Sequence, residues 1–140
     1  MKRSSHAVWK GDLKSGSGTM KVGADLFSGQ YSFASRFESG TGTNPEELIA
    51  AAHAGCFSMA FSAELSGAGH TPEEVATTAA VSLEKQGDGF AITGVHLTAK
   101  AKVPGIKDDE FQKIAQAAKE GCPVSRALKA ITITVEATLV

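Results

Sequence analysis

The chain has 140 residues, a formal net charge of -1 at pH 7, and the apolar and charged fractions of an ordinary globular protein. This length predicts one domain, residues 1–140, or one intertwined unit of a dimer. The balanced charge argues against general binding to nucleic acid or to an anionic membrane surface.

The N-terminal residues, Met-Lys-Arg-Ser-Ser-His, include two basic side chains, but no apolar segment follows them. No signal peptide is predicted, and we therefore expect a cytoplasmic protein. In that compartment the two cysteines are expected to be free thiols, metal ligands or redox-active groups rather than a structural disulfide.

Short strands are predicted in the first part of the chain, at residues 6–11 and 19–23, with a Gly/Ser turn between them. Residues 31–37 alternate, so that their aromatic side chains share one face and Arg36 lies on the other. A loop rich in Gly and Thr follows.

The central segment, residues 44–67, has the signals of a long helix. Asn44 suits the N-cap and Pro45 the first helical position, and Glu47 is placed to complete a capping box. Gly67 is a plausible end. Because the segment is apolar nearly all round, we expect a helix buried in a core or an interface, which a chain of this length has difficulty surrounding alone.

A membrane span is the alternative interpretation of this segment. Its uninterrupted apolar part is shorter than the ~20 residues that a bilayer requires. It also contains His53, Ser58 and Ser62, and Glu64 closes it. A buried helix is therefore preferred.

The second half of the chain alternates between strand and helix patterns. A change of parity at Gly94 predicts a β-bulge. The predicted strands are residues 75–85, 90–103 and 131–140, and the predicted helices are residues 108–120 and a short one from Cys122 to Lys129. This order indicates an α+β fold with antiparallel sheets.

The two cysteines have different local surroundings. Cys56 lies in the middle of the apolar helix, where burial makes a thiol inert unless a cation is near, and Arg36 is the best candidate in the sequence. Cys122 lies at the start of a helix, where free N–H groups favour a thiolate. Local physics therefore favours Cys122 as the more acidic thiol.

Two further residues deserve a functional interpretation. Glu46 has no assigned role, because Glu47 suffices for the capping box, although any acid in the first turn is favourable there. His53 lies three residues before Cys56 and could share a metal with it. Two more ligands would be needed, and the other histidines show no metal-type spacing, so no metal is predicted.

Several stretches together resemble the OsmC/Ohr family of thiol-dependent peroxidases, and the OsmC (osmotically inducible protein C) branch more closely than the branch of organic hydroperoxide resistance proteins. The resemblance runs from the Trp-Lys-Gly at residues 9–11 to the C-terminus. The stretches that carry it are Arg36–Glu38, Gly42–Leu48, Ala51–Met59 and Gly121–Ser125.

The resemblance implies that Cys56 is the peroxidatic cysteine, Cys122 the resolving cysteine, Arg36 the activating residue and Glu46 its acidic partner. It implies an intertwined homodimer with two sites at the interface, a hydroperoxide substrate, no metal, haem or flavin cofactor, and a dithiol reductant, which in relatives is a lipoyl group on a carrier protein. The alternative is a non-enzymatic stress-related binding protein that keeps the fold.

Two expectations concern the site itself. Residues 46 and 56 are about 15 Å apart along one helix, so one arginine can hardly touch both, and Glu46 is expected to come from the other subunit if both belong to one site. Four aromatic residues near the motif, Phe33, Phe37, Phe57 and Phe61, suggest an apolar-walled pocket that favours organic hydroperoxides over hydrogen peroxide.

Overall fold

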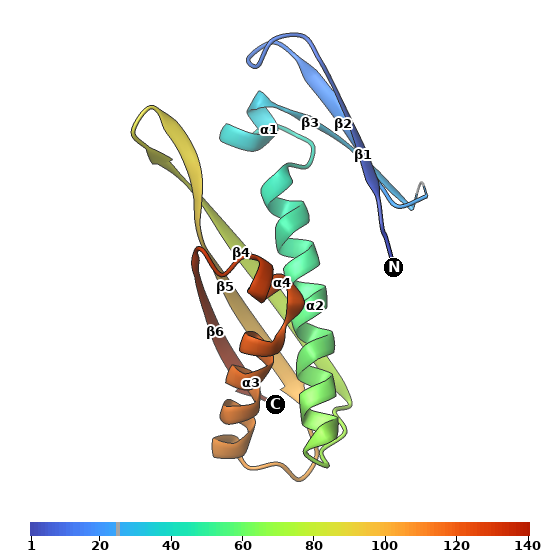
Figure 1. Cartoon of the computed structure of the whole chain (residues 1–140), viewed down its shortest axis with the longest axis vertical. Helices are drawn as coiled ribbons and strands as arrows, with labels where there is room; N and C mark the ends of the chain where they lie inside the picture. Colours follow the sequence, from blue (N-terminus) through green and yellow to red (C-terminus); the bar gives the residue numbers. More distant parts are fainter. Residues whose placement is uncertain (25) are drawn as a thin grey trace. The chain divides into compact units, whose positions relative to one another are not determined.

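A computed structural model describes residues 1–24 and 26–140 (Figure 1). Within these residues, two sheets of three strands and four helices confirm the α+β class. The chain divides into two units, Met1–Leu48 and Ile49–Val140, and helix α2 (Pro45–Gly67) crosses the boundary between them. The prediction of a single domain stays a prediction.

The first unit contains an antiparallel sheet of β1 (Ser5–Lys10), β2 (Ser17–Val22) and β3 (Phe27–Ser32). Gly18 of β2 is paired with Trp9 on one side and Tyr31 on the other. The two aromatic rings pack over it with centroids 5.2 Å apart. A Cβ at residue 18 would collide with the Tyr31 ring, so this cross-strand aromatic pair requires glycine.

Residues Phe33–Phe37 form helix α1, so the two-face alternation predicted for residues 31–37 is wrong for this part of the segment. Two serines start the helix. The Ser35 N–H donates to Ser32 Oγ at 3.1 Å, and the Ser32 N–H donates to Ser35 Oγ at 2.9 Å. This reciprocal capping box ends β3 at residue 32 and places Arg36 in the last turn of a helix.

The predicted start of α2 is confirmed at its N-cap. The Glu47 N–H donates to Asn44 Oδ1 at 2.8 Å. The Glu47 carboxylate does not complete the expected capping box; it accepts from the Thr43 hydroxyl at 2.9 Å instead. Because the helix starts at Pro45, Glu46 and Glu47 both lie in its first turn, where negative charge is favourable.

The second unit contains a sheet ordered β4 (Glu74–Gln86), β5 (Gly89–Lys102) and β6 (Thr132–Leu139). Strands β4 and β5 form an antiparallel hairpin whose register shifts where Ser82 faces Gly94 and Leu83 faces Ile92. Thr93 is the extra residue, which confirms the bulge predicted beside Gly94.

Strand β6 pairs with β5 in parallel, so the prediction of antiparallel sheets is wrong for this strand. The reason is the connection, because the chain leaves β5, passes through α3 (Asp108–Gly121) and α4 (Pro123–Ala127), and returns in the same direction. Figure 1 shows α2, α3 and α4 on one face of this sheet.

One face of α2 is buried in the core of the second unit. It presents a row at intervals of four residues, consisting of His53, Phe57, Phe61 and Leu65, all fully buried. The row packs against apolar residues of β5 and α3, including Leu97, Ala99, Phe111 and Ala115. Tilted ring contacts join Phe61 to Phe57 and to Phe111, with centroids 5.5 and 5.1 Å apart.

The other faces of α2 carry exposed residues within the part of the chain that the structure describes, so one face is buried in the core as predicted, and burial of the remaining faces in an interface stays a prediction. Met59 is 77% exposed, and Ala52, Gly55 and Ala63 are also exposed. By length and composition alone α2 could cross a membrane, with a mean hydropathy of 1.3, although core helices of soluble proteins pass the same test. The fold therefore leaves an apolar helix face exposed.

We expect Phe61→Ala to lower the free energy of unfolding by about 3–5 kcal/mol, because it removes a fully buried ring at the centre of the core. Phe90→Ala is the matched control. Because Phe90 is 56% exposed, its replacement should lower the free energy of unfolding much less. Urea unfolding followed by circular dichroism at equal protein concentration measures both. Equal losses would contradict the assigned core.

Candidate active site

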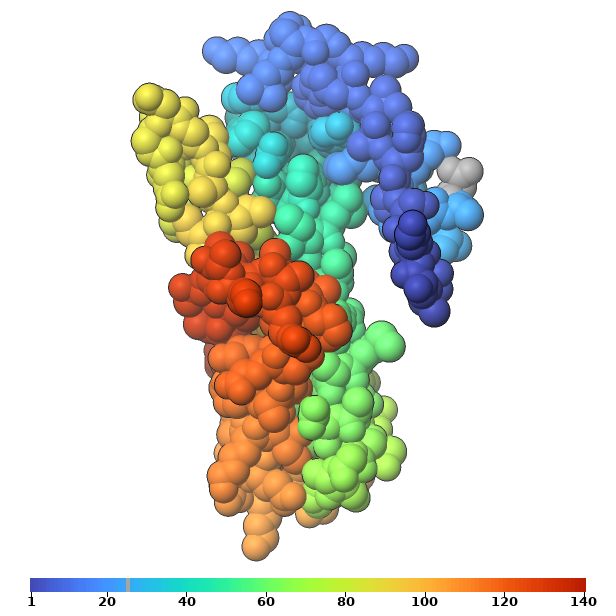
Figure 2. Space-filling view, viewed as in Figure 1, coloured from blue at the N-terminus to red at the C-terminus, as the bar shows by residue number. Residues whose placement is uncertain are grey.

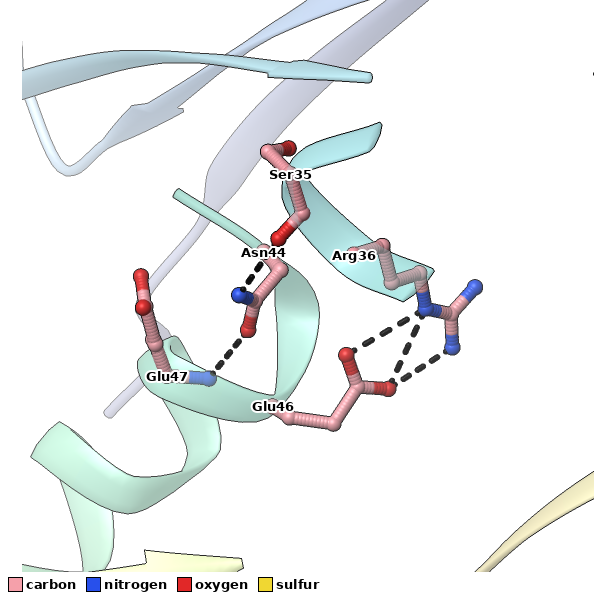
Figure 3. Close-up of polar contacts among 5 residues, drawn as sticks. All are labelled: Ser35, Arg36, Asn44, Glu46 and Glu47. Atoms are coloured by element: carbon pink, nitrogen blue, oxygen red, sulfur yellow. Dashed lines mark hydrogen bonds and ion pairs between the residues drawn. The ribbon is translucent and has the colours of Figure 1, made fainter. Parts of the chain in front are cut away.

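Arg36 and Glu46 form an ion pair within one chain. Arg36 Nη2 lies 2.7 Å from Glu46 Oε1, and Arg36 Nε lies 3.2 Å from both carboxylate oxygens (Figure 3). The Glu46 side chain is only 10% exposed, whereas that of Arg36 is 35% exposed. The guanidinium also lies over the Phe37 ring, 5.1 Å from its centroid. The carboxylate therefore holds the guanidinium with one edge still open to solvent.

The loop between α1 and α2 fixes this pair. Ser35 Oγ donates to the Thr43 carbonyl at 2.8 Å, and Asn44 Nδ2 donates to the Ser35 carbonyl at 3.1 Å. Gly42 has a φ of 114°, and a Cβ there would lie 2.6 Å from the Gln30 carbonyl oxygen. Glycine thus permits the tight path that brings the end of α1 beside the first turn of α2.

Cys56 and Cys122 form the second pair, within the unit Ile49–Val140. Both are free thiols, Cys56 partly exposed and Cys122 buried, and they lie close enough for each to shift the pKa of the other. Cys56 comes from the middle of α2 and Cys122 from the junction of α3 and α4. Figure 2 shows the chain of α4 and the end of α3, in red and orange, covering the middle of α2.

The pKa values of the two thiols are shifted in opposite directions. Burial raises the pKa of Cys56; the Val124 N–H opposes this, and the contact with Cys122 raises it further. Burial also opposes ionisation of Cys122, but its pKa is lowered, because the Ser125 N–H, the Cys56 thiol and the Ser125 hydroxyl all favour its thiolate. The local expectation that Cys122 is the more acidic thiol agrees with these directions.

The predicted site residues are thus brought together as two pairs, Arg36 with Glu46 and Cys56 with Cys122. Among the described residues, the groups that shift the pKa of Cys56 include no lysine or arginine. The cation that sequence reasoning required for a reactive Cys56 is therefore not among its neighbours in the second unit.

Ser125 is a site residue that sequence reasoning missed. It lies in the first turn of α4, and its hydroxyl is 2.7 Å from His53 Nε2. The sequence feature that could have identified Ser125 is its position three residues after Cys122, from which a hydroxyl can reach back to the N-cap residue.

His53, considered as a metal ligand in the sequence, is hydrogen-bonded to the Ser125 hydroxyl instead. In the part of the chain that the structure describes, no group of three or more His, Cys, Asp or Glu could hold a metal.

Two of the four phenylalanines of the expected pocket do not line one within their own unit. Phe57 and Phe61 are fully buried in the core, and the Phe33 and Phe37 rings pack on each other with centroids 4.9 Å apart. A cavity of about 700 Å³ is present beside Ser125, lined by residues of α3, α4 and the region around β6, but neither cysteine lines it. The apolar-pocket argument for substrate preference therefore has no support from Phe57 and Phe61.

An α+β chain with two neighbouring free thiols has the fold and the side chains expected of a thiol-dependent enzyme. The chain belongs to the OsmC family, since the family model described as "OsmC-like protein" matches residues 38–136. It is 54% identical over 125 residues to peroxiredoxin OsmC of Escherichia coli (strain K12), covering 89% of this chain and 87% of the relative.

Solved structures show the same fold. An organic hydroperoxide resistance protein OsmC from Legionella pneumophila is 27% identical with a TM-score of 0.75, covering 97% of this chain and 96% of that one. The organic hydroperoxide resistance protein OhrB of Bacillus subtilis is 26% identical with a TM-score of 0.73, covering 98% of each chain.

Proposed function

We propose that this protein is a thiol-dependent peroxidase that reduces hydroperoxides in oxidative and osmotic stress defence. The observation that carries the proposal is the proximity of the partly exposed Cys56 to the buried Cys122, because a two-electron oxidation can join these thiols in a disulfide. The names of its relatives, a peroxiredoxin and organic hydroperoxide resistance proteins, support the same activity. The substrate class is organic hydroperoxides, with hydrogen peroxide as a second substrate.

In the first step the Cys56 thiolate attacks the terminal oxygen of the hydroperoxide. A sulfur–oxygen bond forms as the oxygen–oxygen bond breaks, and the leaving alkoxide takes up a proton to become the alcohol. Cys56 is then a sulfenic acid. In the second step the Cys122 thiolate attacks this sulfur, the disulfide forms, and hydroxide leaves and becomes water.

The two thiols supply both electrons, so these steps need no metal, haem or flavin. The cycle closes when an external dithiol reduces the disulfide by exchange, becoming a disulfide itself. A lipoyl group on a carrier protein is the proposed reductant. We place the protein in the cytoplasm, where such dithiols are kept reduced.

We infer that the chain acts as a homodimer. The exposed apolar face of α2 supports this, because it includes Met59 and several small residues that permit close approach of another helix. A Cβ added at Gly55 would meet nothing within 4 Å in this chain. A second copy is therefore the proposed cover for this face.

We further infer that the site is shared between the two copies. Cys56 needs a cation, and Arg36 is held by the Glu46 of its own chain. Residues 46 and 56 lie about 15 Å apart along a continuous α-helix. The Arg36–Glu46 pair of one copy is therefore proposed to serve the Cys56 of the other.

The thiol roles are tested by peroxide consumption. Wild-type protein should form an intrachain Cys56–Cys122 disulfide, seen by peptide mapping, and Cys122→Ser should consume about one equivalent and stop at the sulfenic or a higher acid. Cys56→Ser should consume none. A Cys56→Ser protein with full activity would make Cys122 the nucleophile, and lack of consumption by the wild type would leave the non-enzymatic binding protein as the better description.

Arg36→Lys should raise the pKa of Cys56 and slow its reaction with peroxide, because an ammonium cannot hold a carboxylate and a thiolate with the planar geometry of a guanidinium. The pH dependence of Cys56 alkylation in a Cys122→Ser background should move to higher pH. Arg126→Lys is the matched control. An unchanged profile for Arg36→Lys would remove Arg36 from the site.

Mixed dimers test the shared site. A Cys56→Ser chain paired with a Glu46→Gln chain should keep one intact site per dimer, formed by the Cys56 of the second chain and the Arg36–Glu46 pair of the first. Sites built within one chain would leave none. Activity no higher than that of the two variant homodimers would reject sharing, provided that Glu46→Gln alone is strongly impaired.

A further inference from the structure

The mechanism above leaves one buried titratable side chain unused. His53 is fully buried in the row of α2 that faces the core. Its Nε2 lies 2.7 Å from Ser125 Oγ, and its Nδ1 is buried without a hydrogen-bond partner among the described residues. A histidine held by one hydroxyl between the two cysteine-bearing segments requires an explanation beyond packing.

The unpartnered nitrogen determines where the proton lies. Burial lowers the pKa of His53, so the ring is neutral and carries one N–H. A buried N–H without a partner is rarer and less tolerable than an unused lone pair. The proton is therefore assigned to Nε2, which donates to Ser125 Oγ.

This assignment leaves the hydroxyl proton of Ser125 free for another acceptor. Cys122 is the N-cap of α4 and Ser125 is the third residue of that helix, so the hydroxyl and the thiol belong to the same helical turn. The Ser125 hydroxyl also favours the Cys122 thiolate. Among the described residues, the other titratable groups near the thiol are Cys56, which shifts its pKa, and Glu64 of α2 beside Gly121. Strands β5 and β6 present apolar residues to this core, and the charged Lys119, Glu120 and Arg126 line the adjacent cavity.

We propose that His53 is a positioning residue for disulfide closure: its Nε2–H directs the Ser125 hydroxyl proton toward the sulfur of Cys122. The inference rests on the proposed role of Cys122 as the resolving thiol. The hydroxyl stabilises Cys122 as a thiolate, whose electron pair forms the bond to the Cys56 sulfur while hydroxide leaves. His53 neither gains nor loses a proton in this step.

The tautomer can be measured on the reduced wild-type protein. Long-range proton–nitrogen NMR spectra should show His53 protonated on Nε2, unprotonated on Nδ1 and neutral across the pH range of activity. A ring protonated on Nδ1 would overturn the proposal, because Ser125 would then have to donate to the histidine and could not donate to Cys122.

The effect on Cys122 is measured in a Cys56→Ser background, where a serine hydroxyl replaces the neighbouring thiol. Thiolate absorbance in the ultraviolet follows ionisation of the buried sulfur. Ser125→Ala and His53→Leu should both move the Cys122 titration to higher pH. His96→Leu is the matched control, because His96 bonds to the Thr134 hydroxyl at 2.6 Å but is exposed. A His53→Leu titration that is unmoved or shifted to lower pH would overturn the proposal.

The consequence for the reaction is measured in a single turnover with one equivalent of peroxide. Sulfenic acid formation should not slow in Ser125→Ala and His53→Leu, because a less ionised Cys122 does not oppose ionisation of Cys56. Disulfide closure should slow about tenfold or more, as expected for a lost hydrogen bond to a charged sulfur. Slowing of both steps equally, or of neither, would contradict a role in closure. If wild-type protein forms no disulfide, the proposed function fails instead, while the NMR and titration results still decide the positioning role.

Discussion

The packing of one face of α2 is the constraint on which the second unit depends. The row that contains His53, Phe57, Phe61 and Leu65 must be buried, and β5, β6, α3 and α4 supply the surface that buries it. Cys56 is adjacent to this row, at the point where the α3–α4 junction passes over the helix. Contact between the thiols therefore follows from the burial of the helix rather than from a special local motif.

The same environment affects the two thiols differently. Desolvation opposes ionisation of both, but only Cys122 has enough donors around it, from the first turn of α4 and from its neighbouring side chains, to overcome that cost. The chain thus favours ionisation of Cys122 by itself, as its proposed role of attacking thiol in the second step requires. The proposed activation of Cys56 requires a positive charge, and among the described residues the groups that shift its pKa include none.

The Arg36–Glu46 pair illustrates how much local structure one ion pair requires. A capping box forms α1, a glycine with positive φ turns the loop, and Asn44 both caps α2 and bonds to the Ser35 carbonyl. These contacts join residues that are close in the sequence, and they hold the Arg36 guanidinium against the nearly buried Glu46 carboxylate. The guanidinium is thus held in place before any reaction, as its proposed role of stabilising a thiolate requires.

The sequence by itself determined the central helix with its Asn44–Pro45 start, the bulge beside Gly94, the short helix after Cys122 and, through resemblance, the family. These features depend on residues that are close together in the sequence, so helix-capping residues and alternating patterns are enough to predict them. Tertiary structure alone decided that residues 33–37 form a helix, that β6 runs parallel to β5, and that the Ser125 hydroxyl meets His53. The direction of a strand is set by the path of the connection that leads to it. A contact between residues 72 positions apart is set by which faces of the elements are buried together. No single segment of the sequence encodes either the strand direction or the contact, because both depend on segments that are distant in the chain.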